Sequence, residues 1–120
     1  MLKDQNSSTT PKLITMLTYK DVTIPNAIDV FSSHSDMPNK FWGFKNVGLP
    51  TSDMKILIDL MKAKKKTIFL EVVTLNEEKC LEGARLSLEY EIDYLIGTIY
   101  YPSVHKMLEN QPVKYFPFCG

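Results

Sequence analysis

The sequence has few cysteines, no surplus of charge of either sign and no long apolar run. Its 120 residues include two cysteines, and fourteen acidic side chains balance fourteen basic ones, so the formal net charge is zero. Proteins that bind nucleic acid or an anionic membrane usually carry a surplus of Lys and Arg, so neither partner is expected. No apolar run approaches the roughly 20 residues that span a bilayer.

The two cysteines and two histidines do not form a metal-binding or disulfide pattern. Cys80 and Cys119 match neither a zinc spacing nor a disulfide framework, and His34 and His105 lack ligand-spaced partners. Residues 1–11 are polar and lack the apolar core of a secretory signal. We therefore expect a cytoplasmic protein with reduced thiols, no metal ion and no cofactor, in which a flexible leader (1–11) precedes one domain (12–120).

Apolar and β-branched runs alternate with segments whose apolar residues recur three or four positions apart, which predicts alternating strands and helices. The expected strands are 13–18, 41–44, 67–73, 94–100 and 113–118. Thr23 is the expected N-cap of the first helix, and Thr74 with Glu77 forms a capping-box pattern before the third. The resulting order is βαβαβαβαβ.

Alternating strands and helices with short connections predict a parallel sheet. A doubly wound nucleotide-binding sheet would carry a Gly-rich turn after its first strand, but residues 18–22 contain no glycine. The predicted fold is therefore one half of a TIM (β/α)8 barrel. Because an open half-barrel exposes two unpaired edges and its inner face, we expect completion by self-association, by a partner chain or by a missing carboxyl-terminal half. We favour the last, because the fifth strand would normally lead into another helix.

Strand alternation predicts which side chains face the interior of the barrel. In the second strand, Trp42 and Phe44 suit the helical shell, which turns Lys45 inward. In the third strand, the aliphatic residues at 68, 70 and 72 suit the shell, which turns Glu71 inward. Lys45 and Glu71 should then meet near the carboxyl ends of neighbouring strands, where barrel enzymes hold their catalytic groups.

Other polar side chains are expected at the same rim. Asn46 follows Lys45 directly, Thr18 ends the first strand, and Thr98 and Tyr100 lie near the end of the fourth. Hydroxyl and amide groups at these positions could orient a carbonyl or phosphate oxygen of a substrate. Asp21 also lies at this rim, although Asp favours turns for purely local reasons.

The two central residues suit either of two roles. Lys45 could act as an electrostatic clamp on an enolate or phosphate, or as a Schiff-base nucleophile, while Glu71 moves a proton. The alternative is a structural Lys–Glu ion pair at the mouth of the barrel.

Four short stretches resemble consecutive βα units of the phosphate-binding (β/α)8 barrels. They are residues 69–74, 93–98, 101–104 and 113–118. They are similar in particular to the 2-keto-3-deoxy-6-phosphogluconate aldolases and, around residues 44–46, to the orotidine-phosphate decarboxylase group. The resemblance implies a carbon–carbon lyase (aldolase or decarboxylase) or isomerase that acts on a small phosphorylated sugar or keto acid.

Two functional hypotheses follow. The first is the amino-terminal half of such an enzyme, inactive alone, because the phosphate site after strands seven and eight of a complete barrel is absent. The second is a noncatalytic barrel module that binds a metabolite or a partner chain, since fold alone does not fix function.

Overall fold

A computed structural model describes residues 13–118. The predicted leader and Cys119 lie outside these residues. The main strands are β1 (Thr15–Met16), β4 (Phe41–Lys45), β5 (Thr67–Glu71), β6 (Tyr94–Ile99) and β7 (Lys114–Phe118). They form one sheet in the order β1-β4-β5-β6-β7, and every neighbouring pair is parallel. The prediction of an α/β fold with a mostly parallel sheet is confirmed, while the described residues form no closed barrel.

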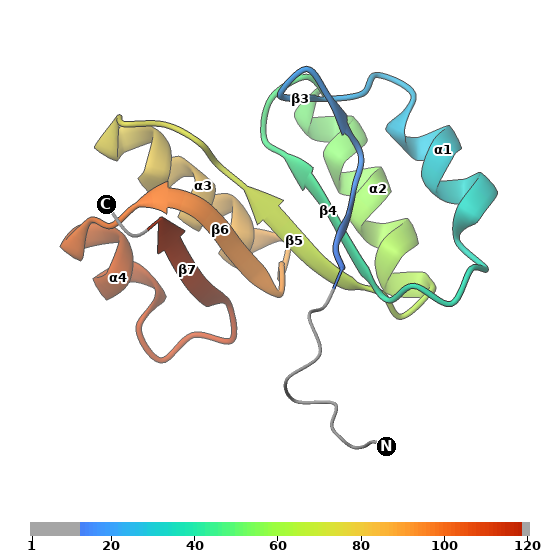
Figure 1. Ribbon diagram of the computed structural model, residues 1–120. Coiled ribbons are helices and arrows are strands. Elements are labelled where there is room, and N and C mark those ends of the chain that lie inside the picture. The colour runs from blue at the N-terminus through green and yellow to red at the C-terminus, as the bar shows by residue number, and fades with distance from the viewer. Residues whose placement is uncertain (1–12, 119–120) are drawn as a thin grey trace, which may run out of the picture.

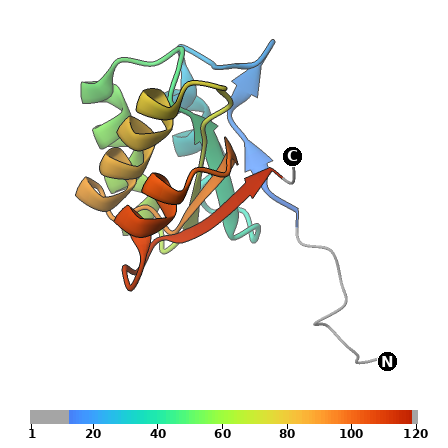
Figure 2. The same cartoon turned by 90° about the vertical axis from the view of Figure 1, so that its left-hand side faces the viewer.

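Four helices connect the strands, and they lie together on one side of the sheet (Figures 1 and 2). They are α1 (Ala27–His34), α2 (Thr51–Ala63), α3 (Glu77–Glu89) and α4 (Pro102–Leu108). None of the helices in residues 13–118 is long and apolar enough to cross a membrane. Within residues 13–118 the architecture is thus two layers: the helices cover one face of the sheet, and none of them covers the other (Figure 2).

A small hairpin lies between β1 and α1. Strands β2 (Thr18–Tyr19) and β3 (Val22–Thr23) pair antiparallel through Lys20 and Asp21, whose φ angles are 51° and 67°. Positive φ at both central residues is the signature of a type I′ turn. The sequence did not predict this hairpin, and Thr23 is not the N-cap of α1, because it belongs to β3 and Asn26 precedes the helix.

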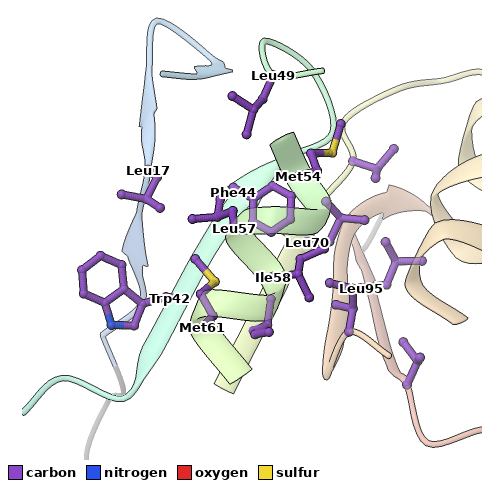
Figure 3. Packing of buried hydrophobic residues seen from close by; sticks show 14 of the residues in the cluster. Leu17, Trp42, Phe44, Leu49, Met54, Leu57, Ile58, Met61, Leu70 and Leu95 are labelled. Atoms are coloured by element: carbon purple, nitrogen blue, oxygen red, sulfur yellow. The ribbon is translucent and has the colours of Figure 1, made fainter. Parts of the chain in front are cut away.

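The core fills the space between the sheet and its helices (Figure 3). Trp42 and Phe44 of β4 and Leu70 of β5 are buried in one cluster with apolar residues of α2, as strand alternation predicted. The members contributed by α2 are Met54, Leu57, Ile58 and Met61.

Helix α3 approaches the sheet through small side chains. Its buried residues are Cys80, Gly83, Ala84 and Ser87, and a Cβ at Gly83 would lie 2.8 Å from Cγ2 of Val72. The cap also differs from the expected Thr74–Glu77 pair, because Asn76 is the N-cap and its side chain accepts a hydrogen bond from the backbone N–H of Lys79 at 2.9 Å. Asn is among the preferred N-cap residues.

The open face of the sheet carries a row of aromatic rings, one from each of four neighbouring strands. Phe41, Phe69, Tyr94 and Phe116 follow one another with centroid distances of 5.8, 4.5 and 5.7 Å. Phe116, at the end of the row, is 57% exposed. Parallel sheets are ordinarily covered on both faces, so this apolar face is unusual.

The two-layer packing predicts that alanine substitutions at two adjacent residues of α2 lower the free energy of unfolding by different amounts. Leu57 is buried under the sheet, whereas Ile56 is exposed. Leu57→Ala should lower the free energy of unfolding by about 2–5 kcal/mol, because it leaves a cavity in the core. Ile56→Ala, the matched control, should change it by less than about 1 kcal/mol. Urea denaturation of both variants measures the difference, and equal losses would contradict the assigned layers.

Candidate functional site

Lys45 and Glu71 end neighbouring parallel strands and are register partners. They line a hollow of about 390 Å³ at the carboxyl ends of β4 and β5. Its lining residues are Asp21, Lys45, Asn46, Val47, Glu71 and Val73. The structure therefore brings together Lys45, Asn46 and Glu71, and Asp21, which was also expected at this rim, lies beside them.

Asp21 is the ion-pair partner of Lys45. The lysine Nζ lies 3.5 Å from Asp21 Oδ1, and the side chains are 13% and 97% exposed respectively. Within residues 13–118 no ion pair joins Lys45 to Glu71. A pair with one fully exposed partner contributes little to stability, so an anionic or carbonyl oxygen of a ligand could take the place of Asp21.

The hydroxyl of Thr23 fixes the position of Lys45. It donates a hydrogen bond to the backbone carbonyl of Lys45 at 2.7 Å and accepts one from the backbone N–H of the same residue at 2.8 Å. Thr23 is fully buried. One side chain thus joins the hairpin to the end of β4 and holds Asp21, at the hairpin turn, beside the lysine.

The remaining predicted residues do not line this hollow. Thr98 is buried, and its hydroxyl donates a hydrogen bond to the hydroxyl of Tyr115 at 2.9 Å. Tyr115 packs against the helical core, and Tyr100 stacks on it with a centroid distance of 6.4 Å. Thr18 lines a different hollow, of about 340 Å³, beside α1. Hence the structure groups neither threonine nor Tyr100 with Lys45.

A local irregularity in β6 explains the position of Thr98. The pairing of β6 with β7 shifts between Ile96 and Ile99, and Gly97 has a φ of 86°. An irregularity of this kind interrupts the regular alternation of faces. Counting alternate residues therefore gives the wrong face for Thr98, although it gives the correct face for residues of the regular strands β4 and β5.

Within residues 13–118, no cysteine or histidine lines the hollow. Cys80 is buried in α3, and burial raises the pKa of its thiol, which disfavours the nucleophilic thiolate. Residues 13–118 contain no group of three or more His, Cys, Asp or Glu side chains that could hold a metal ion. The chemistry of the hollow thus consists of one ammonium, two carboxylates and one amide.

Comparisons with protein-family models, with curated proteins and with solved structures give no match for this chain. The function has to be inferred from the hollow and from the sheet that carries it.

Loss of the Thr23 hydroxyl should weaken the attachment of the hairpin to the end of β4 at Lys45. Thr23→Val removes both hydrogen bonds to the backbone of Lys45 and should lower the free energy of unfolding by about 1–3 kcal/mol, because polar backbone groups lose their partner. Thr18→Val, on the paired strand of the same hairpin, is the control and should stay within about 0.5 kcal/mol. Denaturation and amide hydrogen exchange at Lys45 test this, and unchanged exchange would contradict it.

Proposed function

We propose that this chain contributes the amino-terminal half of a (β/α)8-barrel enzyme, a carbon–carbon lyase or isomerase that acts on a small phosphorylated sugar or keto acid. The observation that carries the proposal is the position of Lys45 opposite Glu71. Both residues lie at the carboxyl ends of parallel strands, which is where barrel enzymes hold their reacting groups.

The topology supports a half-barrel. The strands follow one another across the sheet without reversal, in the order β1-β4-β5-β6-β7. Since βα crossovers have one handedness, an order without reversal sends every helix to the same face. In a complete barrel this face is the outer ring, and the aromatic row of the open face would form part of the packed interior.

The residues of the hollow suit carbonyl chemistry. In a retro-aldol step, Glu71 would take the proton of the substrate's β-hydroxyl group, and the bond between the α and β carbons would break. The electron pair of that bond would move to the oxygen of the substrate's carbonyl group and form an enolate. The Lys45 ammonium would stabilise the resulting enolate. Glu71 would then return the proton to the enolate carbon. The amide of Asn46 would orient the substrate oxygen. In an isomerisation, Glu71 would move a proton between neighbouring carbons.

The charges of the hollow indicate which end of the substrate binds there. Lys45 is a single cation among two carboxylates, Asp21 and Glu71. This set repels a dianionic phosphate about twice as strongly as the single carboxylate of a keto acid, and a carbonyl oxygen needs only one hydrogen-bond donor. The carbonyl end of the substrate is therefore assigned to Lys45, and a phosphate would bind elsewhere in the complete barrel.

A noncatalytic module that binds a metabolite or a partner chain is the second candidate. The exposed end of the aromatic row favours it, since Phe116 is 57% exposed and exposed apolar surface often marks a binding surface. The two candidates differ in what they require of Lys45.

An NMR titration of the full chain with pyruvate measures the affinity of the chain for this keto acid and so tests the role of Lys45. Lys45→Met should weaken binding at least about tenfold, because it removes a charged hydrogen-bond donor. Lys55→Met is the matched control, because Lys55 is also paired with one exposed carboxylate, that of Asp59. The Lys55→Met variant should bind pyruvate with the affinity of the wild type.

Borohydride treatment in the presence of pyruvate separates the two lysine mechanisms. A clamp leaves no covalent adduct, whereas a Schiff base is trapped as a stable mass increase that Lys45→Met abolishes. If Lys45→Met changed only the stability of the protein and left pyruvate affinity unchanged, the enzymatic role of Lys45 would be refuted in favour of the structural ion pair.

A further inference from the structure

A second hollow adjoins the one that contains Lys45. Its volume is about 380 Å³, and its walls are Val73, Thr74, Leu75, Gly97 and Ile99. Val73 lines both hollows. The two therefore share a wall, and a ligand seated at Lys45 could extend across this boundary.

Gly97 keeps the boundary free of a side chain. A Cβ at this position would lie 2.9 Å from Cγ and 3.6 Å from Oε2 of Glu71. Its φ of 86° is also one that residues with a side chain rarely adopt. The Glu71 side chain thus lies against bare backbone of β6, between the polar hollow and its neighbour.

The second hollow differs from the first in chemistry. Three of its five lining residues are aliphatic, namely Val73, Leu75 and Ile99. Helix α3 begins two residues after Leu75 and carries Glu77 and Glu78 in its first turn. Carboxylates there oppose the binding of an anion at a helix amino end. A phosphate group is therefore disfavoured in this hollow, and an apolar group is favoured.

We propose that the two hollows form one two-part site for a 2-oxo acid with an apolar side chain. This inference rests on the proposed function, and of the two substrate classes named there it selects the keto acid. The oxo-acid end lies at Lys45 and Glu71, and the aliphatic end lies against Leu75 and Ile99. Gly97 is a positioning residue, because its missing side chain leaves room both for Glu71 and for the ligand.

A series of 2-oxo acids of increasing aliphatic length tests the two-part site on the full chain. NMR titrations with pyruvate, 2-oxobutanoate and 4-methyl-2-oxopentanoate should give affinities that rise by about fourfold for each methylene buried. Pyruvate should shift the amide resonances of Lys45 and Glu71. The longer acids should also shift those of Leu75 and Ile99.

Matched variants separate the apolar hollow from the polar one. Leu75 and Leu13 are both strongly exposed, at 78% and 85%, so replacement of either by Asp should leave the fold intact. Leu75→Asp should lower the affinity for 4-methyl-2-oxopentanoate more than that for pyruvate and so remove the preference for the longer acid. Leu13→Asp should retain the preference.

A pair of glycine variants tests whether Gly97 leaves the room that a ligand needs to reach both hollows. A Cβ would be crowded at both Gly97 and Gly83, the latter 2.8 Å from Val72 Cγ2, so both alanine variants should lower stability. Gly97→Ala should also weaken the binding of 4-methyl-2-oxopentanoate at least tenfold, whereas Gly83→Ala should leave the affinity of the folded protein unchanged. Equal affinities of the two variants would refute the positioning role of Gly97.

The failure of this inference can be told apart from failure of the proposed function. If all three acids bound equally and shifted only the polar hollow, the two-part site would be overturned while the role of Lys45 stood. Resonance shifts at Thr74 and Leu75 on addition of inorganic phosphate would overturn the apolar assignment. If no 2-oxo acid bound, the two-part site would be overturned together with the keto-acid form of the proposed function.

Discussion

The pairing of β4 with β5 determines the geometry of the whole candidate site. Lys45 lies opposite Glu71 only because Trp42 pairs with Ile68 and Phe44 with Leu70 further along the same strands. These four residues are buried beneath the helices, and a register slip would disturb their packing. Since burial of one face specifies register strongly, the apolar face of the sheet fixes the polar groups at its edge.

The sequence allowed prediction of the regular strands and of the residues that face away from the helices in β4 and β5, because apolar residues alternate there without interruption. It failed at β6, where the irregularity at Gly97 places Thr98 on the helical side. It also missed the contact of Asp21 with Lys45, because a type I′ turn usually contains glycine, whereas this one uses Lys20 and Asp21. Both failures arise from backbone conformations that residue periodicity does not encode.

The absence of a reversal in strand order has a further effect on where a ligand can bind. In doubly wound sheets the order reverses, helices cover both faces, and the ligand crevice forms at the point of reversal. The sheet described here has no such point. Its polar hollow instead opens at the strand ends, next to a face that no helix of residues 13–118 covers (Figure 2).

The location of the single tryptophan makes the helical layer separately observable. Trp42 is the only tryptophan of the chain. It is buried against Phe31 in an edge-to-face contact of 4.9 Å, and its Nε1 donates a hydrogen bond to the carbonyl oxygen of Asn39. The aromatic row on the opposite face consists only of Phe and Tyr rings. Tryptophan emission therefore reports the integrity of the helical layer, while tyrosine absorbance at Tyr94 responds to whatever covers the open face.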